Sequence, residues 1–193
     1  NEHMPIINSH FRTSYFFKNK HINTVYRTLF TRPKVSYIRQ RVSTDNQDFI
    51  DLDISSVSSK KAALLIHGLE GSSQSSYVLA SARYFNNHGI DVIVFNLRGC
   101  SGDPNKRFES YHSGETKDLD FVIRYVIKNY VYNNISLVGF SLGGNMLLKY
   151  LGEKKWNLKM FDKVFKSKKR EDLFKLSNIT SLFFNLTSAK NLL

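Results

Sequence analysis

Apolar and polar residues follow two periodicities along this chain, and the first of them predicts strands. Residues alternate between apolar and polar over 35–42 and 47–54, which predicts two strands with Thr44-Asp45-Asn46 as the turn between them. Continuous apolar runs are typical of parallel strands that are buried on both faces. Residues 62–66 form such a run and 135–138 a short, largely apolar one, and residues 91–95 are predicted to be a further strand.

The second periodicity is helical, and the segments that show it lie between and after these strands. Apolar residues at helical spacing predict one helix over 77–88, which Gly89 ends, and another over 115–130. The apolar positions of a third helix are Leu142, Met146, Leu147 and Tyr150, and this helix is expected to end at Gly152. The alternation of strands and helices predicts an α/β fold built on a doubly wound, mostly parallel sheet.

One junction between a strand and a helix carries a motif of chemical interest. Residues 139–143 read Gly-Phe-Ser-Leu-Gly, and a G-x-S-x-G between an apolar strand and a helix is the pattern of a nucleophile elbow. In so tight a turn Ser141 must adopt strained backbone angles, and side chains in place of Gly139 or Gly143 would clash. Ser141 is therefore the candidate nucleophile. A glycine-rich turn without chemistry is the alternative interpretation.

Two further loops are expected beside this elbow, because loops that leave the carboxyl ends of parallel strands meet at one edge of the sheet. They are residues 67–73 and 96–102. Acyl transfer by a serine needs N–H donors for the developing oxyanion. We expect the backbone N–H groups of Leu69 and Leu142 to form this oxyanion hole. The glycines of 67–73 also suit a phosphate-binding loop, but no lysine follows at Walker spacing.

Three other residues in or near these loops have side chains that could take part in a reaction. His67 is interpreted as a structural residue that orients its loop by hydrogen bonding, in preference to a catalytic base. For His112 three roles stay open: capping the helix that follows, lining the site, or neither. Cys100 is interpreted as a small packing residue, since a reactive cysteine requires a lowered pKa.

Length and composition limit the class of protein. At 193 residues, with 41% hydrophobic and 13% aromatic residues, the chain suits one globular α/β domain. It contains no apolar run long enough for a transmembrane helix and no apolar segment after a basic start, so we expect no membrane span and no signal peptide. The single cysteine fits a reducing compartment, and we expect a cytoplasmic location.

The net charge of +12 is spread unevenly along the chain. Residues 1–152 contain 18 Lys and Arg against 12 Asp and Glu, whereas residues 153–193 contain 10 against 4. Because the basic excess is concentrated near the end rather than on a binding face, we expect no specific nucleic-acid partner. The alternative to an enzyme is a non-catalytic basic interaction module that binds anionic surfaces through residues 154–175.

Five blocks taken together resemble the YheT-like branch of the α/β-hydrolases, a set of esterases and lipases. The blocks are residues 17–24, 67–73, 96–102, 111–114 and 137–145. The resemblance implies a Ser-His-Asp carboxylic ester hydrolase that acts on small esters or acylglycerols and needs no metal or organic cofactor. It is compatible with weak contact to a membrane surface, and it leaves the oligomeric state undetermined.

The histidines depart from the pattern of this family. In this fold the triad runs in the order Ser, then Asp or Glu, then His. All six histidines, residues 3, 10, 21, 67, 88 and 112, precede Ser141. The histidine base is therefore absent, and Asp162, Glu171 and Asp172 qualify as acids by their order alone. A triad without its base retains about 10³–10⁴-fold catalysis over water, so we expect a nearly inert chain.

These departures divide the chain into residues 1–152, the N-terminal part of an α/β-hydrolase domain, and residues 153–193, a basic tail. The C-terminal strands of the family are expected to be missing, although Leu182-Phe183-Phe184 is apolar enough for a strand. Three explanations of the tail are open. They are a frameshift near residue 153, a fragment of a longer sequence, and a real protein without hydrolase chemistry.

Overall fold

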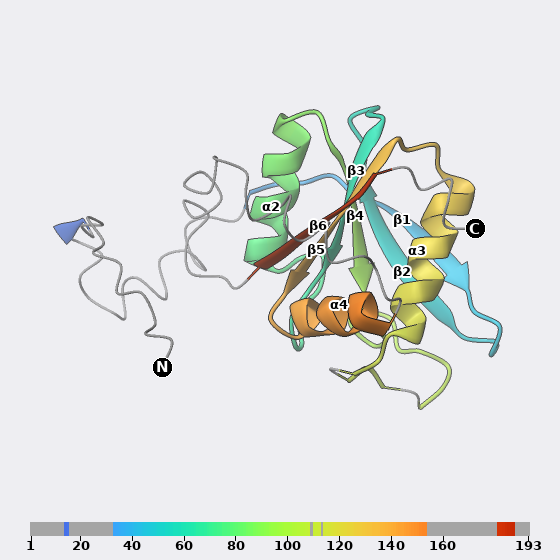
Figure 1. Cartoon of the computed structure of the whole chain (residues 1–193). Coiled ribbons are helices and arrows are strands. Elements are labelled where there is room, and N and C mark those ends of the chain that lie inside the picture. The colour runs from blue at the N-terminus through green and yellow to red at the C-terminus, as the bar shows by residue number, and fades with distance from the viewer. Residues whose placement is uncertain (1–13, 16–32, 109, 113, 154–180, 188–193) are drawn as a thin grey trace, which may run out of the picture. The chain divides into compact units, whose positions relative to one another are not determined.

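The computed structural model in Figure 1 describes residues 14–15, 33–108, 110–112, 114–153 and 181–187. The chain divides into two compact units, Asn1–Arg32 and Pro33–Leu193, and every element named below belongs to the second. Several predictions fall outside the described residues: the block at 17–24, the segment 154–175, and the acids Asp162, Glu171 and Asp172.

Six strands form one mixed sheet in the order β1-β2-β4-β3-β5-β6. The three central strands β4, β3 and β5 pair in parallel, whereas the pairs β1–β2, β2–β4 and β5–β6 are antiparallel. The α/β class is thus confirmed, and the parallel part of the sheet is its centre. The strands span Ile38–Ser43, Phe49–Ser55, Lys61–Ile66, Asp91–Asn96, Asn134–Phe140 and Ser181–Thr187, from β1 to β6.

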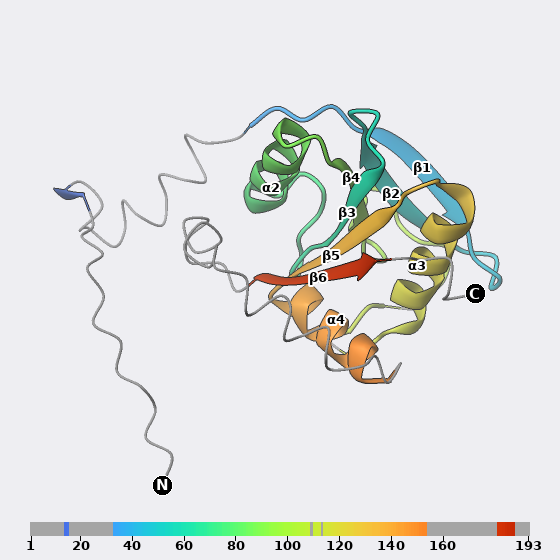
Figure 2. The same ribbon diagram turned by 45° about the horizontal axis from the view of Figure 1, so that its top comes forward.

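Strand β6 contains the apolar triplet that the sequence marked as a candidate strand. It lies antiparallel beside β5, with Leu137 opposite Phe184 and Phe140 opposite Ser181 (Figure 2). Because β3 pairs with the other side of β5, the strand that leads to Ser141 is hydrogen-bonded along both edges. An interior strand of this kind is a firmer support than an edge strand, whose backbone groups lack partners on one side.

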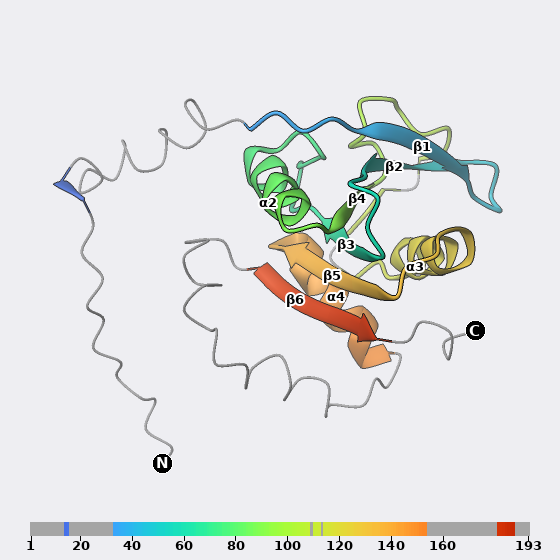
Figure 3. The same cartoon turned by 90° about the horizontal axis from the view of Figure 1, so that it is seen from above.

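The three helices of the described residues cover the two faces of the sheet unequally. Helix α2 (Ser76–Asn87) covers one face, and helices α3 (Lys117–Asn129) and α4 (Leu142–Glu153) cover the other (Figure 3). Successive residues of the central strands point to opposite faces, so Leu65 packs with the α2 side and Leu64 with the α3–α4 side. Both faces are buried, which explains why these strands read as continuous apolar runs.

The helix boundaries differ from their predictions by one or two residues, and the end of α4 has a visible cause. Helix α4 continues through Gly152 to Glu153 instead of ending at the glycine. Glycine ends a helix when it takes a left-handed conformation, and Gly152 is not among the residues with positive φ. The last residue is held in place by its side chain, because Glu153 accepts a hydrogen bond from the Thr116 hydroxyl and forms an ion pair with Lys149. No helix of the described residues is long and apolar enough to cross a bilayer.

Candidate active site

The path of the chain marks the carboxyl ends of β3 and β5 as the expected place of a site. These strands are neighbours, but β3 leads into α2 on one face of the sheet and β5 leads into α4 on the other. Loops that diverge in this way leave a gap where the strand order changes direction, and ligands of open α/β sheets bind there. The loop 67–73 leaves β3, and the elbow 139–143 joins β5 to α4.

The elbow has the strained geometry that its motif predicts. Ser141 has φ of +50°, a left-handed value that residues with a side chain rarely adopt, and it is exposed at the surface. A Cβ on Gly139 would lie 2.6 Å from the Gly143 carbonyl oxygen, so the strand and the helix meet too closely for a side chain there. A Cβ on Gly143 would press on the backbone oxygens of Ile66 and His67, at the end of the neighbouring strand.

The loop 67–73 lies directly against the elbow. A Cβ built on Gly68 would be 3.3 Å from the Ser141 Cβ and 3.3 Å from the Phe140 carbonyl oxygen. The next residue, Leu69, is 67% exposed, whereas His67 is fully buried. The structure therefore brings the predicted donor loop and the predicted nucleophile together.

The backbone N–H groups of this loop show a clear pattern of hydrogen bonding. Of the six amides from Gly68 to Ser73, five donate to an acceptor at 2.9–3.0 Å, and only the Leu69 N–H has no acceptor within the described part of the chain. The acceptors are Tyr77 Oη for Gly68, Tyr111 Oη for Glu70, the Gly68 carbonyl for Gly71, Ser75 Oγ for Ser72 and Asn96 Oδ1 for Ser73.

His67 fixes the start of this loop. Its Nε2 accepts the Leu97 N–H at 3.0 Å, and since a backbone N–H can only donate, the ring proton must sit on Nδ1. Nδ1 then donates to the Gly68 carbonyl at 2.7 Å. Burial lowers the pKa of His67, although the hydrogen bond to Gly68 opposes the change. The ring is neutral and both of its nitrogens are hydrogen-bonded, which supports the interpretation of His67 as a structural residue.

Acidification should therefore weaken the fold through His67. Below the ordinary histidine pKa of about 6.5 the unfolded chain binds a proton that the buried ring does not, so stability is full above this pH and falls as pH drops towards the folded-state pKa. Urea unfolding between about pH 7.5 and 5.5 would measure a loss of at most about 1.4 kcal/mol per pH unit from this group. The stability that buried carboxylates contribute to the fold is lost only at lower pH, near and below their pKa values, and so lies outside this window.

The control compares two glutamine variants. His67→Gln should remove this acid dependence, whereas His88→Gln, which changes an exposed histidine after α2, should retain it. Equal slopes of unfolding free energy against pH in wild type and His67→Gln would show that the prediction is wrong.

The far end of the loop is tied to the same strand end as the near end. Asn96, the last residue of β4, accepts the Ser73 N–H and donates through Nδ2 to Asp53 at 2.8 Å. Arg39 on the outer strand β1 grips the same carboxylate with two hydrogen bonds of 2.8 and 2.9 Å. A continuous series of polar contacts thus leads from the β1–β2 hairpin to the loop 67–73.

The loop after β4 is anchored by Arg98, which donates to two carboxylates. It bonds Asp48 at 2.7 Å and Asp118 at 2.6 and 2.8 Å, and its own side chain is only 6% exposed. Burial opposes the ionisation of Asp48, but hydrogen bonds from Asn105 and the Lys106 N–H, together with the Arg98 charge, outweigh it and hold the pKa of this carboxyl below its usual range. The network joins the outer hairpin, this loop and α3.

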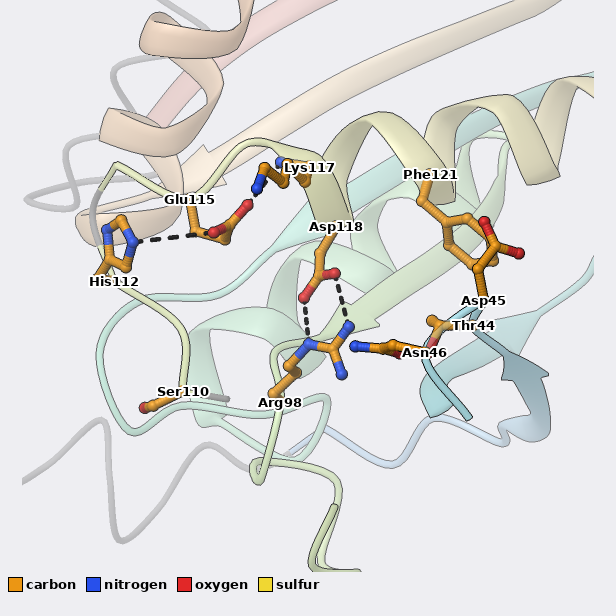
Figure 4. Close-up of a pocket in the computed structure, with 10 residues that line it drawn as sticks. All are labelled: Thr44, Asp45, Asn46, Arg98, Ser110, His112, Glu115, Lys117, Asp118 and Phe121. Atoms are coloured by element: carbon orange, nitrogen blue, oxygen red, sulfur yellow. Dashed lines mark hydrogen bonds and ion pairs between the residues drawn. The ribbon is translucent and has the colours of Figure 1, made fainter. Parts of the chain in front are cut away.

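Neither Cys100 nor His112 forms a hydrogen bond with Ser141 among the described residues. Cys100 is half-buried beside Tyr111, and burial raises the pKa of its thiol, which supports a packing role. His112 accepts the Gly114 N–H at 3.1 Å and lines a pocket of about 480 Å³ beside the start of α3 (Figure 4). The charges of this pocket are largely satisfied internally, as Arg98 and Asp118 illustrate, and neither the elbow nor the donor loop lines it.

Comparison with known proteins assigns the family. The model of the alpha/beta hydrolase fold matches residues 62–161, which include all three loops described above. The chain belongs to the α/β-hydrolase family. Within this family it is YheT-like: it is 37% identical to the protein named putative esterase YheT of Escherichia coli (strain K12), over 68% of this chain and 40% of that protein.

Other α/β-hydrolases of the comparison are lipid enzymes by name. Phospholipase ABHD3 of Homo sapiens is 28% identical over 79% of this chain and 40% of its own length. Monoacylglycerol lipase of Saccharomyces cerevisiae is 30% identical over 60% of this chain and 26% of its own length. This α/β-hydrolase chain therefore spans less than half the length of these relatives.

Solved structures share the fold at lower identity. The esterase Pf2001 of Pyrococcus furiosus superimposes with a TM-score of 0.55 at 20% identity, covering 63% of this chain and 46% of that one. Est1E of Butyrivibrio proteoclasticus, solved with ferulic acid bound, gives a TM-score of 0.53 at 18% identity, over 60% of this chain and 48% of that one. These likenesses show the α/β-hydrolase fold.

Proposed function

We propose that this chain carries the nucleophile and the oxyanion hole of a serine carboxylic ester hydrolase for small esters or acylglycerols. The observation that carries the proposal is that, of the amides from Gly68 to Ser73, only that of Leu69 has no acceptor among the described residues. Within the described part of the chain the Leu69 N–H has no acceptor, while the amides of Gly68 and Glu70 on either side of it do, and Gly68 lies against Ser141, which has a left-handed conformation. The names of the relatives supply the substrate class.

The chemistry assigned to these residues is acyl transfer. Ser141 Oγ attacks the ester carbonyl carbon, and the carbonyl oxygen becomes an anion that accepts hydrogen bonds from the N–H groups of Leu69 and Leu142. Leu142 is the first residue of α4, where N–H groups have no partner inside the helix. Collapse of this intermediate expels the alcohol and leaves an acyl-enzyme, which water hydrolyses.

The proton of the Ser141 hydroxyl needs an acceptor in this mechanism. In a complete triad a histidine takes it, but no histidine follows Ser141 in this sequence. Among the described residues, no side chain hydrogen-bonds the Ser141 hydroxyl. We therefore propose slow catalysis by this chain on its own, limited by transfer of the proton to solvent.

Covalent labelling tests the proposal more directly than turnover, because losing a nucleophile changes turnover little once the base is absent. A fluorophosphonate probe should phosphonylate Ser141 slowly in the wild-type chain, and added imidazole should accelerate the reaction severalfold by serving as the base. Intact mass and peptide mapping measure the rate and the site. Ser141→Ala should abolish the labelling.

Ser110→Ala is the matched control, because Ser110 is exposed on the loop before α3 and is assigned no role in catalysis. Its labelling rate should equal that of the wild type. Labelling that persists in Ser141→Ala, or that maps to a different serine, would contradict the proposed function.

A further inference from the structure

We infer that Tyr77 and Tyr111 are positioning residues of the proposed oxyanion hole: their hydroxyls hold the amides on either side of Leu69 and so leave the Leu69 N–H as the donor. The inference rests on the proposed function for its chemical meaning. Its geometry rests on hydrogen bonds described above, from Gly68 to Tyr77 Oη at 2.9 Å and from Glu70 to Tyr111 Oη at 3.0 Å.

Tyr77 contacts both halves of the site. It lies in the first turn of α2, and its ring packs against Phe140, with ring centroids 5.0 Å apart. Phe140 immediately precedes Ser141, and Gly68, which donates to the Tyr77 hydroxyl, immediately precedes Leu69. One rigid side chain therefore spans from the nucleophile segment to the donor segment and sets the spacing between them.

The loop is shaped around the Tyr77 hydroxyl. The Gly71 N–H bonds back to the Gly68 carbonyl at 3.0 Å and closes a tight turn, and a Cβ on Gly71 would lie 2.6 Å from Tyr77 Oη. The hydroxyl thus occupies the space that a side chain at position 71 would fill. This close approach explains the second glycine of the loop without any phosphate-binding role.

Tyr111 holds the other side of Leu69 from a different element. It belongs to the segment between β4 and α3, and it fixes Glu70, whose φ of +52° is left-handed. A non-glycine residue keeps such a conformation only where its surroundings enforce it. The Tyr111 hydroxyl accepts the N–H of this left-handed residue and so stabilises the turn that follows Leu69.

A functional reason distinguishes this arrangement from ordinary loop packing. Oxyanion stabilisation depends on donors that are fixed before the reaction, and small misplacements cost large factors in rate. Tyrosine hydroxyls that accept the flanking amides remove two competing donors and fix the orientation of the third. A purely structural hydroxyl would stabilise the fold without changing the reactivity of Ser141.

The experiment uses Tyr77→Phe and Tyr111→Phe in the full chain, since each removes a hydroxyl and keeps the ring. Tyr84→Phe, at a 41% exposed position on the same helix as Tyr77, is the matched control. Three quantities are measured: amide hydrogen exchange of residues 68–73, the thermal midpoint, and the rate of Ser141 phosphonylation well below the lowest midpoint.

We expect Tyr77→Phe to speed Gly68 exchange at least tenfold and to slow phosphonylation by about tenfold. Tyr111→Phe should act in the same direction on Glu70, and Tyr84→Phe should match the wild type. Faster exchange with an unchanged phosphonylation rate, or unchanged exchange, would overturn the inference. If the wild type itself is not labelled at Ser141, the proposed function fails, and the exchange of Gly68 and Glu70 alone then decides whether the tyrosines hold the loop.

Discussion

Gly143→Ala is expected to lower the free energy of unfolding by about 3 kcal/mol. The added Cβ would lie 2.6 Å from the His67 carbonyl oxygen and closer still to that of Ile66. Both are backbone atoms where β3 ends, and β3 is one of the central strands of the sheet, so relief requires that α4 or the β3–β5 pairing moves. A flexible side chain could rotate away from the clash, but a strand that is paired on both sides cannot.

Urea unfolding followed by circular dichroism measures this loss, and the same helix offers the control. Gly152 also lies in α4, but a Cβ there would meet nothing within 4 Å. Gly152→Ala should therefore raise stability by roughly 0.5–1 kcal/mol, because alanine loses less backbone entropy in a helix. If both alanine variants unfold at the wild-type midpoint, the close packing at Gly143 is not the constraint described above.

Arg98→Met is the second change with a large expected effect, a loss of about 3 kcal/mol in the free energy of unfolding. Methionine keeps most of the side-chain volume but removes the cation, which leaves the fully buried Asp48 carboxylate without its charge partner. An uncompensated buried charge costs several times more than an exposed ion pair contributes. The loop after β4 should loosen together with the hairpin turn that carries Asp48.

Arg124→Met provides the comparison for this variant. Arg124 forms an ion pair with Asp120 one helical turn away on α3, but its side chain is 55% exposed, so its loss should change the urea midpoint little. The measurement is the difference between the urea midpoints of the Arg98→Met and Arg124→Met variants. Equal midpoints for Arg98→Met and Arg124→Met would mean that burial does not govern the strength of these pairs.

The central sheet and the elbow were predictable from the sequence because their signals are local. The strands at 62–66 and 91–95 are buried on both faces, so an apolar run is their direct signature. Ser141 was predicted to be strained because the glycines around it occur in a fixed spacing, and its φ of +50° confirms this.

The contacts that complete the site were not predictable in the same way, because they join residues far apart in the chain. Nothing in the sequence pairs Glu70 with Tyr111 or Asn96 with Ser73, since polar side chains carry no periodic signal of their partners. The antiparallel pairing of β6 with β5 also arises from a long-range contact. The end of α4 was missed for a similar reason, because Glu153 is held by Thr116 from another segment.

The hydrogen bonding of the loop 67–73 has a thermodynamic consequence for any molecule that binds Leu69. Ordering a free loop on binding costs about 1–2 kcal/mol of backbone entropy for each residue that becomes fixed. Here both ends of the loop are bonded to the end of β4, and five of its amides have partners before any ligand arrives. Most of that entropy is lost during folding, so binding at Leu69 should proceed with little further ordering of the protein.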